Sequence, residues 1–212
     1  MGPLRLSATL SPSYRSWWNV AFDYRSDQIL GPALAYWERK RGSRAMPSRA
    51  EIEPSEVIGL LPNLQLIDVT AGGARFRYRL VGTAIVQAFG REYTGRWLDE
   101  LVATERSKFA EEVYRLACSE RLPVFARSTY VTATERELIV NRICMPLSVD
   151  DVTVTMIMGA LTFQSSVRPV AGVWEKARML DARWTEVIKP TEPSGEALAC
   201  ARPARPKKAL IR

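Results

Sequence analysis

ELIVNRICMPL (residues 137–147) and VTVTMIMGALTF (residues 152–163) decide the fold of this chain. Both stretches are rich in β-branched and other apolar residues, and both have the length of a long strand. The four residues between them, SVDD (148–151), have the polar character of a hairpin turn. We therefore expect two neighbouring antiparallel strands.

The segments that precede this hairpin predict the rest of a sheet and its helices. Strands are expected over residues 64–69, 75–80 and 124–132, because apolar residues alternate or run continuously there. An amphipathic helix is expected over residues 104–118. The resulting order is two strands, short helices, a longer helix and three strands. It favours an α+β domain with its helices segregated to one face of an antiparallel sheet.

Other segments extend this domain at both ends. A helix is expected over residues 27–41, with Gly42 at the position of a left-handed cap. The chain is therefore expected to consist of an irregular arm (1–25), a helix with a connector (26–63), a central domain (64–166), a C-terminal helix (167–188) and a basic, disordered tail (189–212).

The charge of the chain is concentrated near its C-terminus. The net charge is +7, and from Lys189 onward there are six basic and two acidic residues, which is +4 of that total. The body of the protein is thus only mildly basic, and its hydrophobic content of 47% is ordinary for a globular protein. Binding to nucleic acid is not expected for the body.

The absence of histidine excludes several kinds of chemistry. Ser-His-Asp and Cys-His catalysis, histidine metal sites, histidine-ligated haem and a phosphoacceptor histidine all require this residue. Asp68 and Asp99 have no second carboxylate at a spacing that suits an acid–base pair. We therefore expect a protein that is not an enzyme and that has no metal site.

Cysteine usage and hydropathy indicate the compartment. The three cysteines, Cys118, Cys144 and Cys200, are widely spaced and form no C-x-x-C pair, which is typical of reduced thiols in the cytosol. The first 25 residues contain charges and no apolar run, so they do not resemble a secretory signal. The longest uncharged apolar stretch, residues 152–163, is much shorter than a membrane span. We expect a cytoplasmic protein without a membrane span.

Several short motifs occur in an order that is specific as a whole. They are YWxxKRG (36–42), MPSRxxIxP (46–54), LLPxLxLIDV (60–69), FRYRLVGT (76–83), GRExTGR (90–96) and MPLS (145–148). Together they resemble a bacterial family of stand-alone PAS-like proteins over about residues 30–165. The resemblance implies a PAS fold, which is a five-stranded antiparallel sheet in the order 2-1-5-4-3 with helices over one face. The helices expected near the two ends of the chain are extensions of that fold.

The resemblance also implies a role in signal transduction. Relatives in the wider PAS group bind haem, flavin, small organic acids or nothing, so the cofactor stays open. Flavin-cysteinyl photochemistry is disfavoured because it needs a cysteine in the short helices, and no cysteine precedes Cys118. We expect a module that senses a small molecule or binds a signalling protein partner, with its output through another protein. The alternatives are a ligand-free interaction or localisation adaptor and a protein that associates with nucleic acid through its basic tail.

A PAS pocket would lie between the inner face of the sheet and the helix over residues 104–118. The side chains that we expect around it are Phe76, Tyr78, Phe109, Val113, Tyr130, Met156 and Met158. The alternative is that these apolar side chains simply fill a core.

Arg142 is the charged candidate for this pocket. It alternates with Val140 and Cys144 along its strand, and its fork of donors suits a carboxylate or a phosphate. The alternative is an arginine that is exposed or paired with Glu137. Which face it occupies stays open, because the preceding residue, Asn141, and Met145 form a set that is equally suited to point inward.

The helix over residues 27–41 predicts a homodimer. Its apolar face consists of Ile29, Leu30, Ala33, Leu34 and Trp37. This face precedes the first strand, where relatives with this fold commonly pair, and a face of this size has to be covered. The alternative is that the outer face of the chain's own sheet covers it.

Overall fold

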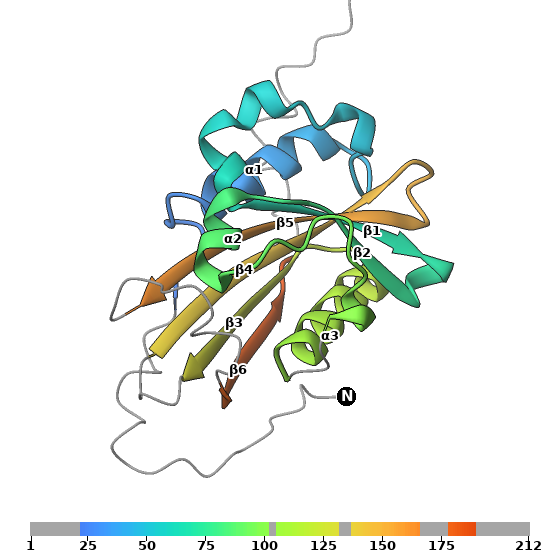
Figure 1. Cartoon of the computed structure of the whole chain (residues 1–212). Helices are drawn as coiled ribbons and strands as arrows, with labels where there is room; N and C mark the ends of the chain where they lie inside the picture. Colours follow the sequence, from blue (N-terminus) through green and yellow to red (C-terminus); the bar gives the residue numbers. More distant parts are fainter. Residues whose placement is uncertain (1–21, 102–104, 132–136, 166–177, 190–212) are drawn as a thin grey trace, which may run out of the picture.

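The computed structural model describes residues 22–101, 105–131, 137–165 and 178–189 (Figure 1). Its strands are β1 (Leu64–Thr70), β2 (Arg75–Val81), β3 (Val124–Val131), β4 (Glu137–Ser148), β5 (Val154–Ser165) and β6 (Arg178–Val187). Its helices are α1 (Leu30–Arg41), α2 (Thr83–Phe89) and α3 (Glu105–Glu120), with 3-10 helices η1 (Arg49–Glu51), η2 (Pro54–Asn63), η3 (Ala71–Gly73) and η4 (Leu98–Glu100). Within these residues no helix has the length and apolar character to cross a membrane.

The strands that the structure describes form a single antiparallel sheet in the order β2-β1-β5-β4-β3-β6. The expected α+β class and the order of the first five strands are therefore confirmed. The predicted hairpin is formed by β4 and β5, in which Ser148 pairs with Val154 next to the turn. Asp150 stabilises this turn, since its carboxylate accepts the backbone N–H groups of Val152 and Thr153 at 3.0 and 2.7 Å.

The C-terminal helix is a prediction that the structure corrects. Arg178–Val187 is strand β6, which pairs antiparallel with β3 from Val124 to Val131. Without β6, the outer edge of β3 would present a row of unpaired N–H and C=O groups. Backbone pairing along that edge outweighs the helical spacing of the apolar residues in this segment. The predicted arm up to residue 21, residues 167–177 of the predicted C-terminal helix and the tail from residue 190 lie outside the described residues.

Helix α1 begins at Leu30, three residues after the expected start at residue 27. The carboxylate of Asp27 accepts the backbone N–H groups of Ile29 and Leu30 at 2.8 and 2.9 Å, so Asp27 caps the first turn. At the other end Gly42 has a φ of 59°, a conformation that glycine adopts at little cost. Its N–H closes the helix on the carbonyl of Glu38.

The helices cover both faces of the sheet (Figure 1). We call the face toward α3 the inner face and the face toward α1 the outer face. On the inner face the guanidinium of Arg142 lies over the ring of Phe109 from α3. On the outer face Thr162 donates a hydrogen bond to Asp27, which caps α1. A sheet covered on both sides explains why nearly every residue of β4 is buried.

The apolar face of α1 packs on its own sheet. Leu30, Ala33, Leu34 and Trp37 are buried within the chain, and Ile29 is half-buried. The indole Nε1 of Trp37 donates a 2.8 Å hydrogen bond to the carbonyl of Pro146 in β4. The four buried side chains are therefore not available to a partner copy, contrary to the interface that we expected. The intramolecular alternative is the one that the structure contains.

Candidate functional site

Strand register places Arg142 on the inner face. In β4 it alternates with Val140 and Cys144, and its cross-strand partner in β3 is Ala126. Because side chains alternate with a period of two, Asn141 faces the other way, toward α1. The ambiguity in the sequence arose because both faces of β4 are buried, so hydrophobicity does not mark either one as inward.

The guanidinium of Arg142 is held by hydroxyl groups of the neighbouring strand. Its Nη2 donates to the Oγ of Ser128 at 3.3 Å and to the hydroxyl of Tyr130 at 3.4 Å. Ser128 in turn donates to the hydroxyl of Tyr130 at 3.2 Å. On the helix side, the guanidinium carbon lies 5.7 Å from the centre of the Phe109 ring. The cation is thus enclosed by β3 and α3.

The positive charge of Arg142 has no acidic partner among the side chains that the structure describes. The residue is 3% exposed, and its Nε makes no hydrogen bond. Glu137, which was the alternative partner, forms no ion pair with it within the described residues. A charge removed from water costs several kcal/mol, at the order-of-magnitude level, unless an opposite charge compensates for it. This lone buried cation is the most unusual electrostatic feature of the inner face.

A second polar group lies beside it, under the middle of α3. The hydroxyl of Tyr114 accepts a 3.0 Å hydrogen bond from the Nε2 of Gln65 and lies 3.4 Å from the hydroxyl of Tyr78. Burial raises the pKa of Tyr114 well above its ordinary value, so the phenol is neutral at physiological pH. These contacts tie α3 to β1 and β2.

Gly159 makes room for this group. A Cβ at this position would lie 2.8 Å from the Cγ and Nε2 atoms of Gln65, which is opposite it in β1. The sequence analysis missed Gln65, Tyr114 and Ser128. A glycine inside a strand was the available signal, because such a glycine often marks a close approach.

Six of the eight predicted pocket residues belong to the inner face or to the helix that covers it. They are Phe76, Tyr78, Phe109, Val113, Tyr130 and Arg142. Met156 and Met158 do not join them, because Met158 pairs with Met145 in β4 and with Leu66 in β1, which are outer-face positions. Their placement on the inner face was therefore wrong. The period of two fixes the relation between residues of one strand, whereas only the register relates one strand to the next.

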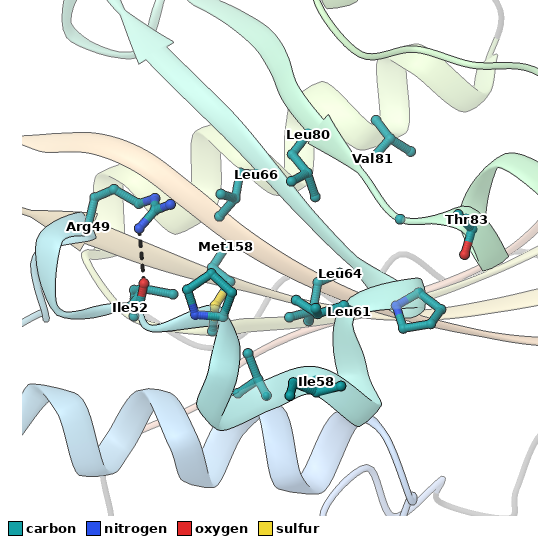
Figure 2. Close-up of a pocket in the computed structure, with 14 residues that line it drawn as sticks. Arg49, Ile52, Ile58, Leu61, Leu64, Leu66, Leu80, Val81, Thr83 and Met158 are labelled. Atoms are coloured by element: carbon teal, nitrogen blue, oxygen red, sulfur yellow. Dashed lines mark hydrogen bonds between the residues drawn. The ribbon is translucent and has the colours of Figure 1, made fainter.

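Met158 instead belongs to an apolar groove of about 530 Å³ on the outer face. Figure 2 shows this groove between η2 and the strands β1, β2 and β5. Its lining consists of Arg49, Ile52, Pro54, Val57, Ile58, Leu61, Pro62, Leu64, Leu66, Leu80, Val81, Gly82, Thr83 and Met158. The sequence did not predict this groove, because the connector that follows the helix in residues 26–63 was not placed on the sheet.

The two described cysteines are shielded thiols. Burial raises the pKa of Cys144 to about 12 and the pKa of Cys118 to about 11. Both are thus almost entirely protonated at neutral pH, and a protonated thiol is a poor nucleophile. The site therefore offers hydrogen-bond donors and a cation for binding, and its thiols are not activated.

The sequence model of the PAS domain family matches residues 28–162. This match spans more than half of the chain, from just before α1 to near the end of β5. Comparison with curated proteins finds no match.

Proposed function

The chain belongs to the PAS domain family, whose members are generally sensing or signalling modules, and we propose that it is a sensor whose inner face holds a small anionic molecule. A small carboxylate or inorganic phosphate has the chemistry that the site would recognise. In this proposal the output passes through another protein that reads the state of the module. The chain itself is proposed to bind and not to catalyse.

The observation that carries the proposal is the uncompensated charge of Arg142. Its Nε has no hydrogen-bond partner, and the hydroxyl of Tyr130 lies 3.4 Å from its Nη2. An anion at this point would receive charge-assisted hydrogen bonds from a planar fork of donors. It would also remove the cost of a lone buried charge, so binding would stabilise the folded protein.

A ligand at Arg142 would act on α3. The guanidinium packs on Phe109, and the same helix is tied to the sheet through Tyr114 and its hydrogen bond from Gln65. A molecule that enters beside Arg142 therefore has to displace or tighten α3. A sensor works by such a shift between two arrangements, provided that the ligand binds one of them better.

Ligand binding is tested with a panel of acetate, succinate, citrate and phosphate, measured by thermal shift and by calorimetry. At least one anion should raise the Tm of the wild type and should bind Arg142→Gln at least about tenfold more weakly, since one charge-assisted hydrogen bond contributes about 1.5–3 kcal/mol. Arg39→Gln is the matched control, because Arg39 is an exposed arginine on α1 that pairs with Glu56. An equal response of all three proteins would contradict the proposal.

Arg142→Met tests the same idea in the absence of a ligand. Methionine keeps much of the volume and removes the buried charge, so the free energy of unfolding should rise, by on the order of the 1–4 kcal/mol that replacing a buried ion pair with apolar groups can contribute. Urea unfolding measures this change. A large loss of stability would show that the charge is already compensated within the chain.

Native mass spectrometry and an absorbance scan of protein purified from its own host distinguish a sensor from a ligand-free adaptor. The proposal expects a bound small mass that is lost in Arg142→Gln. A protein with no bound mass, together with no response to any anion in the panel, would favour the adaptor.

A further inference from the structure

The outer-face groove has the size and lining of a binding site for a small molecule. Its volume of about 530 Å³ is within the range of about 300–1,000 Å³ that ligand pockets usually have. Among the described residues that line it, Arg49 alone is charged, and the others are mostly aliphatic. An apolar cleft with one charged group selects an amphiphile.

The groove is deep along its floor and open at its rim. Leu64, Leu66 and Met158 form the floor from the outer face of the sheet and are buried. At the rim, Ile58 of η2 is 67% exposed and Leu80 of β2 is 42% exposed. Large apolar side chains rarely stand at the surface together without a partner. The volume of about 530 Å³ is that of a small-molecule site, so the groove suits an extended alkyl chain better than a helix of a partner protein.

One end of the groove is closed by backbone. A Cβ at Gly82 would collide with the carbonyl oxygens of Leu61 and Pro62, so the end of η2 lies directly on the segment after β2. Figure 2 shows Thr83 near this end and Arg49 at the opposite end. An elongated ligand would therefore lie along the groove with its polar group toward Arg49.

Arg49 has N–H donors beyond the one that it uses in its hydrogen bond within the chain. Its Nη1 donates to the carbonyl of Ile52 at 3.0 Å, and among the described side chains no carboxylate pairs with it. The nearby acids have other partners, since Glu51 binds Arg44 at 2.7 Å and Glu56 binds Lys40 at 2.8 Å. A guanidinium has five N–H donors, so Arg49 can still bind a carboxylate in a bidentate manner.

We propose that the groove binds a free amphiphile with an unbranched alkyl chain and a terminal carboxylate. The chain lies over Leu64, Leu66 and Met158, and the carboxylate pairs with Arg49. Met158 suits such a ligand, because its unbranched side chain adapts to irregular contacts. This site is on the opposite face of the sheet from Arg142, so it does not depend on the anion site proposed above.

The test uses decanoate at concentrations below its aggregation, with decanol and decyltrimethylammonium as matched ligands, and calorimetry as the measurement. Decanoate should bind the wild type at least tenfold more tightly than either matched ligand. Arg49→Gln should weaken the binding of decanoate about tenfold or more and leave decanol unchanged. Arg39→Gln and Arg142→Gln should bind decanoate as the wild type does.

A second variant keeps the test informative if Arg49→Gln does not fold. Leu80→Glu places a carboxylate at the exposed rim and should abolish decanoate binding while the far-UV circular dichroism stays unchanged. Equal binding of the acid and the alcohol, or decanoate binding that both variants leave unchanged, would overturn the proposal. A second result would also overturn it. The wild type would bind no amphiphile and would be a dimer in solution, and Ile58→Glu would be a monomer, because a second copy of the chain would then occupy the groove.

Discussion

At the residue scale, the inner face depends on side chains that leave room for one another. Gly159 in β5 faces Gln65 in β1, and the amide of Gln65 reaches the hydroxyl of Tyr114 at 3.0 Å. This bond is buried, and a buried polar group that loses its partner costs about 1–3 kcal/mol. The absence of a side chain at Gly159 therefore allows the hydrogen bond that holds α3 on the sheet.

Gly159→Ala is expected to lower the free energy of unfolding by about 1–3 kcal/mol, because the new methyl group displaces Gln65. Gly59→Ala is the control, since a Cβ at Gly59 would meet no atom within 4 Å. That substitution should change stability by less than about 0.5 kcal/mol. Urea unfolding of both variants makes the comparison. Equal effects would mean that Gln65 moves aside without loss.

The cysteines give a residue-scale prediction with a pH dependence. The thiolate is the reactive form, and burial raises the pKa of Cys118 to about 11 and the pKa of Cys144 to about 12. In the folded protein both thiols are therefore protonated below these values. In a Cys200→Ser variant, alkylation by iodoacetamide at pH 8 should be slow, and the rate at Cys118 should rise about tenfold per pH unit toward pH 11. Rapid labelling at pH 7 would contradict this assignment.

At the scale of the elements, α3 is the helix that covers the inner face. Its residues Phe109, Val113, Tyr114 and Ala117 are buried, so they form the face of this helix that packs on the sheet. The same helix carries the ring under Arg142 and the hydroxyl that binds Gln65. Helix α3 therefore contributes side chains both to the core and to the candidate site.

Phe109→Ala is expected to be among the most damaging changes in this helix. Removing a buried aromatic ring costs about 3–5 kcal/mol, through lost burial and through the cavity that remains. Thermal and urea unfolding measure the loss. Lys108→Ala, at the exposed neighbouring position, is the control and should have little effect. A Tm unchanged by Phe109→Ala would show that α3 is not held by this face.

At the scale of the whole molecule, the sheet is enclosed by α3 on one side and by α1 with η2 on the other (Figure 1). The apolar face of α1 is thereby used inside the chain, with Trp37 bonded to Pro146. Leu34→Glu should therefore destabilise the protein by at least about 4 kcal/mol, because it buries an unpaired charge. Ile58→Glu, at an exposed position of η2, should leave the Tm nearly unchanged.

Circular dichroism melting and the solution mass of Leu34→Glu decide whether α1 packs within the chain or between two copies. A folded Leu34→Glu protein with a reduced mass would show that α1 is an intermolecular element after all. Whether the chain forms a homodimer stays a prediction. An interface, if there is one, has to use a surface other than the four side chains of α1 that are buried in the chain.

The sequence by itself determined the α+β class, the strands β1 to β5, a helix at the position of α1 and the amphipathic character of α3. These features depend on local periodicity, capping and turn chemistry, which are encoded within short stretches. It also offered Arg142 as a charged candidate and left its strand face open. Only the tertiary structure decided that residues 178–187 pair as a strand, that Met158 faces away from Arg142 and that α1 is covered by its own sheet. Those outcomes depend on which edges and faces meet across the chain, and hydrophobic pattern does not specify a partner when both faces of a strand are buried.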